Sequence, residues 1–472
     1  MVAMPRAARF LNDPRHPYNR TSPPGKSNLP LRTRTDLPMA SITEAACLLE
    51  TGAIYTRRAG FQRPDATDSP IFLGVKHGAF SLYFGDAPIY HFDLEGRWQR
   101  AFVAGTHYLK GLDGTVRAVE RVREGENLVL RRRTLNYAQS ADLDASIREM
   151  AIDLVEKTAQ ETYTRVEPPD RKGIRPINVD DARELLERVA RWDAAAWFSH
   201  RERYLATYGP IPFLPPESSN PLIVQGEIGQ ARGVTFGGGP APHSAFRSID
   251  EFNRHLEQVA RLLGRRVCQS RLIFLAGDDL FRGESVEEAS AMLEAVASAF
   301  PITPNVFKGK VADGDLDESM IRLEGIAACL YDFEAPRPTV DQWKQLRQRH
   351  LRSLTLGIES GCPDTRAALG RRWADDDLKA LIADCRAAEI RVNLAVVANL
   401  GGLGEISRTA DLVESLDLAP GEMVFLLDVR ELNPSSTAVT LSDPSAEMRI
   451  RLEGLRSRKV KVVSYTLDKQ WF

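Results

Sequence analysis

The stretch PLIVQGEIGQARGVTFGGGPAPHSAFRS, residues 221–248, decides the fold class of this chain. It opens with an apolar segment at 222–227 that predicts a strand, followed by a loop with three consecutive glycines at 237–239. At its end, Ser248 and Glu251 have the spacing of a helix capping box. A strand, a glycine-rich loop and a capped helix in this order form one βα unit.

The βα pattern repeats along the next 200 or so residues. Capping boxes predict further helices after Ser285 and after Thr339, the latter running to Leu351, and an apolar stripe predicts another around Leu378–Cys385. Repeated βα units give parallel strands with right-handed crossovers, so we expect an α/β fold, a partial TIM-type (β/α)6 barrel. The predicted strands are 222–227, 272–276, 325–331, 354–358, 390–397 and 423–429.

The part of the chain before this barrel has a different pattern. Consecutive hairpins with glycine turns at 71–135 predict a small antiparallel β domain, and Ser41 opens a short capped helix before it. Charged amphipathic helices at 140–158 and 179–207 link this domain to the barrel. The expected organisation is a flexible basic tail (1–38), a β-rich domain (39–138), a helical linker (139–210), the barrel (211–440) and a C-terminal helix and strand (441–472).

Composition limits the class of partner and the location of the protein. The formal net charge is −2 and no apolar run reaches the roughly 20 residues that a membrane span needs, so we expect a cytoplasmic protein without a membrane or nucleic-acid partner. The five cysteines have no metal-binding or disulfide spacing. His77, His91 and His107 match no metal motif either, and we interpret them as surface or half-buried strand positions.

Glycines and acids follow several of the predicted strands. Because the carboxyl ends of parallel strands meet at one edge of a barrel, these residues are expected to line a pocket for a small polar cation, a zwitterion or a ribose. The candidate binding residues are Glu227, Gly237, Gly238, Gly277, Asp278, Glu359, Ser360 and Asn399.

Four segments of the chain within residues 211–432 resemble, in their order and spacing, the motifs of the radical SAM superfamily, in its Elp3/MiaB-like branch. The segments are FLPPESSNPLIVQGEIG, LIFLAGDDLF, LTLGIESGCPDTRAALGRRW and AAEIRVNLAVVANLGGLGE. The resemblance implies a pocket for S-adenosylmethionine, whose amino group would meet the glycine and acid of the second motif, Gly277 and Asp278. It would also imply three cysteines in the loop after the first strand that hold a [4Fe–4S] cluster.

The loop departs from the family at those three cysteines. Gln230, Val234 and Gly237 occupy their positions. Iron–sulfur clusters need thiolate or, rarely, imidazole ligands, which valine and glycine cannot supply. We therefore expect no [4Fe–4S] cluster, and no metal at these residues.

Three hypotheses follow from the sequence. The first is a cluster-less homologue that binds S-adenosylmethionine or a related nucleoside through Glu227, Asp278 and Glu359, as a binding, regulatory or partner subunit. The second is an enzyme, either a radical SAM enzyme with a cluster supplied in a non-standard way or one of another class that uses Asp278, Asp279, Glu359 and Cys362. The third is a barrel that serves only as a scaffold for partner proteins.

Overall fold

A computed structural model gives the fold of the chain. It describes residues 57–61, 71–76, 78–84, 87–125, 127–159, 175–177, 179–209, 211, 215, 217–218, 220–228, 245–277, 280–281, 285–303, 321, 323–331, 333, 336–398, 400–428, 438–440 and 445–465. The tail predicted at 1–38 and the helix predicted at Ser41 lie outside these ranges. Within them, no helix combines the length and the apolar character needed to cross a membrane.

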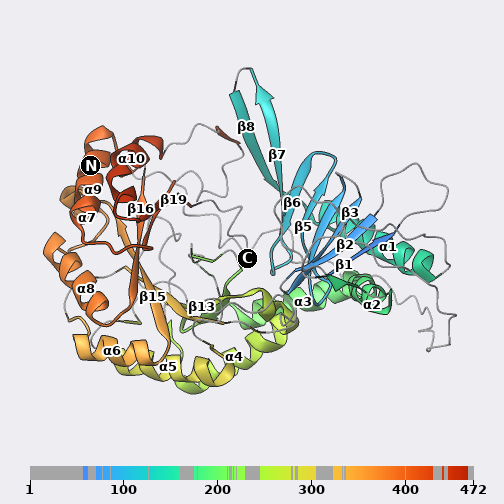
Figure 1. Ribbon diagram of the computed structural model, residues 1–472, viewed down its shortest axis with the longest axis horizontal. Helices are drawn as coiled ribbons and strands as arrows, with labels where there is room; N and C mark the ends of the chain where they lie inside the picture. Colours follow the sequence, from blue (N-terminus) through green and yellow to red (C-terminus); the bar gives the residue numbers. More distant parts are fainter. Residues whose placement is uncertain are drawn as a thin grey trace.

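The first domain contains a ten-stranded sheet with the order β18-β8-β7-β6-β5-β4-β3-β2-β1-β9 (Figure 1). From β1 to β8 each strand pairs antiparallel with the next one along the chain, which confirms the hairpins predicted at 71–135. Two short strands from outside the predicted 39–138 domain, β9 and β18, extend the sheet at its edges. The strands are β1 (Arg57–Phe61), β2 (Ile71–Lys76), β3 (Ala79–Phe84), β4 (Ile89–Asp93), β5 (Trp98–Val103), β6 (Thr106–Lys110), β7 (Val116–Glu124), β8 (Asn127–Thr134), β9 (Arg175–Pro176) and β18 (Ala438–Thr440).

Helices cover one face of this sheet. They are α1 (Tyr137–Ala159), α2 (Val179–Ala190) and α3 (Ala194–Thr207), in place of the two predicted helices. The predicted 179–207 helix divides because Asp193 caps α3, accepting a 2.8 Å hydrogen bond from the Ala196 amide. Ile147 of α1 shares a buried core with Phe80 and Phe92, whose rings stack at 4.9 Å.

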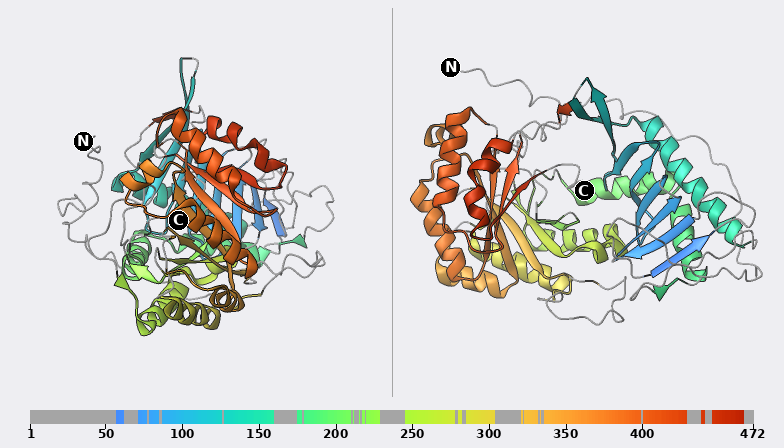
Figure 2. Two further views of the ribbon diagram at one scale, coloured as in Figure 1. Left: turned by 90° about the vertical axis from the view of Figure 1, so that its left-hand side faces the viewer. Right: turned by 45° about the horizontal axis from the view of Figure 1, so that its top comes forward.

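The second domain is built on a seven-stranded sheet with the order β10-β13-β14-β15-β16-β17-β19. Every neighbouring pair is parallel, as the βα repeat predicts. The strands curve into an open barrel whose helices line its outer side (Figures 1 and 2). The strands are β10 (Leu222–Gln225), β13 (Leu272–Ala276), β14 (Gly325–Leu330), β15 (Leu351–Glu359), β16 (Arg391–Val397), β17 (Met423–Leu427) and β19 (Lys461–Ser464), and β11 (Glu227–Ile228) pairs separately with β12 (Ala245–Phe246).

The barrel helices begin where the sequence places their caps. Ser248 and Glu251 form the predicted capping box of α4, and Thr339 and Gln342 form that of α6. The predicted stripe of α8 is buried. The helices are α4 (Ile249–Leu263), η1 (Gly264–Gln269), α5 (Val286–Ala299), α6 (Val340–Gln348), α7 (Pro363–Ala368), α8 (Asp375–Ala387), α9 (Leu403–Ser415), α10 (Ala446–Arg451) and η2 (Glu453–Arg456).

Three expectations for the barrel differ from the structure. The sheet has seven strands, because β19 of the C-terminal segment pairs with β17. The helix α6 ends at Gln348 rather than Leu351, because Leu351 begins β15 and is fully buried there. Ser285 precedes α5 without forming a capping box, since its hydroxyl donates to the Leu280 carbonyl at 3.4 Å.

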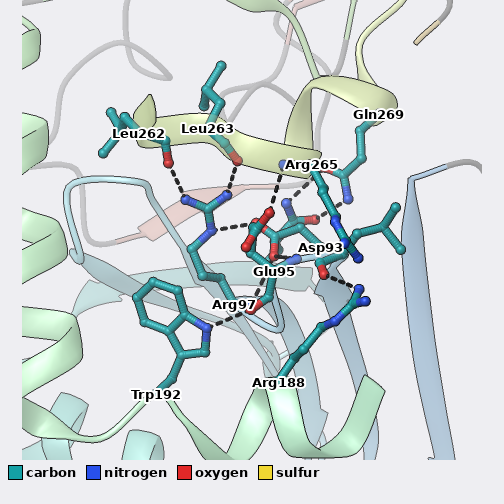
Figure 3. Close-up of polar contacts among 11 residues, drawn as sticks. Asp93, Glu95, Arg97, Arg188, Trp192, Leu262, Leu263, Arg265 and Gln269 are labelled. Carbon is teal, nitrogen blue, oxygen red and sulfur yellow. Dashed lines mark hydrogen bonds and ion pairs between the residues drawn. The ribbon is translucent and has the colours of Figure 1, made fainter. Parts of the chain in front are cut away.

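A turn of the first domain fixes it to the barrel. The Arg97 guanidinium, oriented by Asp93 at 2.6 Å, donates to the carbonyls of Leu262 and Leu263 at 2.7 and 2.5 Å (Figure 3). These two carbonyls belong to the last residues of α4. The last backbone carbonyls of a helix have no partner within the helix, and the negative end of the helix dipole stabilises a nearby cation. Glu95, in the same turn, accepts the Arg265 amide at 2.8 Å.

The linker helices hold the other side of this turn. Trp192 donates its indole N–H to the Glu95 carbonyl at 2.8 Å, and Arg188 donates to the Leu94 carbonyl at 2.8 Å (Figure 3). Gly96 has a φ of +81°, and a Cβ there would lie 2.4 Å from the Arg188 carbonyl carbon. Glycine is therefore required for the turn to fit between the linker and the barrel.

Candidate functional site

The predicted binding residues follow the strands of the barrel, and the structure describes four of them. Glu227, Gly277, Glu359 and Ser360 are in place. Four other candidates, Gly237, Gly238, Asp278 and Asn399, lie outside the described residues, as do Gln230 and Val234.

The structure brings Glu227 and Gly277 together at the ends of neighbouring strands. A Cβ on Gly277 would lie 3.2 Å from the Glu227 Cβ and 2.4 Å from the Leu280 Cδ1. Glu227 itself is 3% exposed. The absence of a side chain at Gly277 therefore lets Glu227 and Leu280 pack at this edge, so a packing role explains the glycine.

The β10 strand end is held by a buried histidine. The Gln225 amide donates to the His255 Nε2 at 2.9 Å, and the Gln225 side chain exchanges hydrogen bonds with the Gly209 backbone. Burial first, and then the nearby Arg247 charge, lowers the pKa of His255 to about 3. The neutral ring is the form whose Nε2 can accept a hydrogen bond from an amide N–H, so this support is constant near neutral pH.

Glu359 ends β15 in a strained conformation and in an ion pair. Its φ is +51°, unusual for a residue other than glycine. One carboxylate oxygen lies 2.5 Å from the Arg371 Nε, and the two side chains are 1% and 4% exposed. The Glu359 carboxylate is thus bound to a cation of its own chain.

The residues after Glu359 are hydrogen-bonded to α9. The Gly361 amide donates to the Thr409 hydroxyl at 2.9 Å, and a Cβ on Gly361 would lie 2.4 Å from the Thr409 Cα. Ser360 donates to Glu405 and accepts the Cys362 amide at 2.9 Å. The Ser360 hydroxyl, another predicted ligand, therefore stabilises the connection between β15 and α9.

Cys362 lies beside these contacts, at the start of α7. The Arg408 Nη1 donates to its sulfur at 3.3 Å. Hydrogen bonds from the amide and side chain of Thr365, and then from Arg408, lower the pKa of the Cys362 thiol below its ordinary range. These contacts favour a thiolate, the nucleophilic form of cysteine.

Glu217 lies against the inner face of the barrel, which the sequence analysis did not anticipate. It accepts hydrogen bonds from the Thr355 hydroxyl of β15 and, at 3.0 Å, from the Asn393 amide of β16. Burial raises the pKa of Glu217, and its second oxygen, Oε2, is buried with no hydrogen-bond partner in the described structure. Only the tertiary fold brings residue 217 to strands 138 and 176 positions away.

Two neighbouring cavities open beside α7, α8 and α9; Arg371, the partner of Glu359, lines one, and Gly361 lines the other. The larger has a volume of about 920 Å³ and the smaller of about 410 Å³, and both are lined by Pro363 and Asp375. In the larger one the Arg366 guanidinium stacks on the Trp373 ring at 4.0 Å and pairs with Asp375 at 2.7 Å. In the smaller one Arg408 brings its positive charge next to Cys362.

Donors for a metal are sparse in the described part of the chain. No group of three or more histidine, cysteine, aspartate or glutamate side chains forms a metal site there. The cysteines Cys268, Cys329 and Cys385 are each buried. Gln230, Val234 and Gly237, which the sequence resemblance aligns with cluster ligands, supply neither a thiolate nor an imidazole and so do not fit a [4Fe–4S] cluster.

The strand histidines make contacts within the first domain. His91 Nδ1 lies 2.7 Å from the Ser81 hydroxyl, and the His107 ring lies 4.5 Å from that of Phe102. Burial, followed by the Arg100 charge, lowers the pKa of His91 to about 4. Both residues are half-buried or exposed strand positions, as the sequence predicts, and His77 lies outside the described residues.

Comparison with known proteins gives structural similarity without sequence similarity. No family model and no curated protein sequence matches this chain. Similar solved structures include methylornithine synthase PylB, with 11% identity, a TM-score of 0.34, and coverage of 52% of this chain and 66% of that one. SuiB of Streptococcus suis, bound to S-adenosylmethionine, has 9% identity, a TM-score of 0.33, and coverage of 78% and 72%. The radical S-adenosylmethionine methyltransferase TsrM of Kitasatospora setae, with cobalamin and a [4Fe–4S] cluster bound, has 14% identity, a TM-score of 0.29, and coverage of 43% and 36%.

The second domain is an open α/β barrel whose neighbouring strands are all parallel. The fold of this domain is defined by its own parallel strand order, β10-β13-β14-β15-β16-β17-β19. The chain spans just under two thirds of PylB and about a third of TsrM, so the activities of those proteins are not transferred to it. In this barrel, Glu227 and Gly277 lie side by side at one edge, whereas Glu359 and Ser360 form contacts within the chain itself.

Proposed function

We propose that this chain is a cluster-less radical SAM-like protein that binds S-adenosylmethionine or a related nucleoside, and that it acts as a binding, regulatory or partner subunit. The observation that carries the proposal is the adjacency of Glu227 and Gly277 at the carboxyl ends of β10 and β13, where α/β barrels place their ligands. A carboxylate there suits the amino group of the ligand or a ribose hydroxyl. The lack of thiolates at 230, 234 and 237 argues against reductive cleavage of the ligand.

Equilibrium dialysis with labelled S-adenosylmethionine tests the binding role. We expect saturable binding to the full chain that Glu227→Gln weakens at least tenfold. Glu324→Gln, which removes a partly exposed carboxylate before β14, is the matched control and should bind as the wild type does. No binding of S-adenosylmethionine, S-adenosylhomocysteine or adenosine by the folded wild type would contradict the proposal.

Anaerobic reconstitution with iron and sulfide tests the missing cluster separately. We expect no stable visible cluster absorbance after desalting. A spectrum with about four irons per chain would instead support the alternative of a radical SAM enzyme whose cluster is held in a non-standard way.

A second candidate function rests on Cys362. Its hydrogen bonds from Thr365 and Arg408 and the adjoining cavity of about 410 Å³ suit a covalent nucleophile, in an enzyme that would also use Asp278 and Glu359. The Glu359–Arg371 ion pair counts against a direct acid–base role for Glu359. A mass-spectrometric search for a covalent adduct on Cys362 after incubation with cell metabolites tests this candidate, with Cys362→Ser as the control.

A further inference from the structure

The ten-stranded sheet has one face packed on helices and one that is not. In an antiparallel sheet directly paired residues lie on the same face, and successive residues alternate between faces. Phe92, Ala101 and Ala118 belong to the core under α1 and α2. The pairing register therefore places on the opposite face five arginines that we call the arginine face: Arg100, Arg117, Arg121, Arg123 and Arg132.

The register brings these arginines close to one another across three strands. Arg100 pairs with Leu109, and Leu109 pairs with Arg117, so two strand spacings, about 10 Å, separate the two arginines. Along β7, Arg121 and Arg123 are about 7 Å apart on the same face. The charges of Arg121 and Arg100 also lower the pKa of His107, after burial, so both guanidinium groups lie near that ring.

The accessible part of the arginine face consists of three of its five arginines. Arg100, Arg121 and Arg123 are exposed, Arg117 is half-buried, and Arg132 is 8% exposed. Among the described strand residues of this face the carboxylate is that of Asp93, which is fully buried and paired with Arg97. A locally positive surface thus lies on a chain whose formal net charge is −2. Helix α1 lies on the outer side of the sheet, and the other side is turned toward the barrel (Figures 1 and 2).

We propose that the arginine face docks an extended acidic segment of a partner protein. The planar guanidinium group matches a carboxylate with two parallel hydrogen bonds, which gives the pair both strength and direction. In an extended peptide, alternate side chains are also about 7 Å apart, so glutamates or aspartates at every second position would meet Arg121 and Arg123 in turn.

The aromatic content of the face favours carboxylates over nucleic-acid bases. Single-stranded nucleic acids bind where exposed aromatic rings offer stacking surfaces beside the basic groups. Among the described residues near these arginines, Phe102 is half-buried with its ring 4.5 Å from the tilted ring of the exposed His107, and Tyr83 is 6% exposed. The face therefore exposes several arginines but no exposed phenylalanine, tyrosine or tryptophan ring among these residues, which suits an acidic peptide.

This inference goes beyond nucleoside binding and does not depend on it. The arginine face is on the first domain, whereas the proposed nucleoside site is at the strand ends of the barrel. A chain that failed to bind S-adenosylmethionine could still bind an acidic segment, and the two assays have separate ligands.

Fluorescence anisotropy with a labelled glutamate oligomer of about twelve residues tests the proposal on the full chain. We expect binding that weakens with added salt and is lowered at least tenfold by the double variant Arg121→Glu/Arg123→Glu. The matched control is Arg131→Glu/Arg133→Glu, which makes the same charge change on the opposite face of the same β7–β8 hairpin. The control should retain wild-type affinity, and circular dichroism should show both variants folded.

Three results would overturn the proposal. The first is no binding of the glutamate oligomer by the wild type. The second is an equal loss in the two double variants, which would mean general charge attraction without a defined face. The third is a single-stranded RNA of the same length that binds more tightly and loses affinity only in Arg121→Glu/Arg123→Glu, which would assign the face to nucleic acid.

Discussion

The Arg371 Nε lies 2.5 Å from a carboxylate oxygen of Glu359, and both side chains are almost fully buried. The pair joins the end of β15 to the segment before α8, twelve residues later. Glu359 has a positive φ, so this contact also holds a backbone conformation that costs about 1–3 kcal/mol. Glu359, which the sequence predicts to bind a ligand, is thus paired with Arg371 of its own chain.

Arg371→Met is expected to destabilise the chain by about 3–5 kcal/mol, because it leaves the Glu359 carboxylate buried without its cation. Urea denaturation measures the change in unfolding free energy. The double variant Glu359→Gln/Arg371→Met should recover part of the loss, since no charge remains buried. A loss below about 1 kcal/mol in the single variant would show that Glu359 is already satisfied by other groups.

Arg97→Met is expected to uncouple the two domains. It removes the hydrogen bonds to the Leu262 and Leu263 carbonyls and leaves Asp93 buried without its guanidinium partner, a cost of about 3–5 kcal/mol. Calorimetry should then show the thermal transition broadened or divided in two.

The matched control for this joint is Arg261→Gln, on the same helix α4. Its side chain is 77% exposed and pairs only with Glu257 one turn away, so a change within about 0.5 kcal/mol is expected. An Arg97→Met chain that unfolds in one transition at the wild-type temperature would refute the role of the joint.

We expect Glu217→Gln to change the free energy of unfolding little, and the variant to become more stable relative to the wild type as the pH rises. The pKa of Glu217 is raised by burial from its ordinary 4.5, so the folded state keeps a proton that the unfolded state releases first. Its contribution to stability is therefore full below about pH 4.5 and falls as the pH rises through the folded-state pKa. Glutamine stays neutral, so the variant should lose this part of the pH dependence.

Urea midpoints for the wild type and Glu217→Gln at about pH 5 and about pH 8 test this expectation. Thr355→Val, which removes a donor to the same carboxyl group, should destabilise the chain at both values. Parallel pH profiles of the wild type and Glu217→Gln would mean that Glu217 ionises normally.

The reactivity of Cys362 tests its thiolate character. Iodoacetamide alkylation, followed by peptide mass spectrometry, should have its half-maximal rate below pH 9.0, the ordinary pKa of a thiol. Arg408→Gln should shift this profile upward, because it removes a donor to the sulfur. Arg254→Gln, on α4, should leave the profile in place, and an unshifted profile in Arg408→Gln would contradict the contact.

The local elements of this chain could be read from the sequence because their signals lie within a few residues of one another. The capping box of Ser248 and Glu251 spans one turn, and the strand predicted at 272–276 has the bounds of β13. Ser285 also has a glutamate three residues later, but no capping box forms there, because the Ser285 hydroxyl donates a hydrogen bond to the Leu280 carbonyl. The binding roles expected for Glu227 and Gly277 remain predictions.

The sequence by itself determined the alternation of strands and helices, the parallel barrel and the antiparallel hairpins before it, and the loss of cluster ligands at 230, 234 and 237 remains a prediction from it. These depend on periodicity, turn residues and side-chain type, which are local properties. The tertiary structure alone decided that Arg371 binds Glu359, that Glu217 bonds to β15 and β16, and that Arg97 donates to the last carbonyls of α4. It also decided that the arginines of the arginine face lie on one side of their sheet. Such contacts join residues that are far apart along the chain, and which residue meets which depends on packing and strand register, not on local pattern.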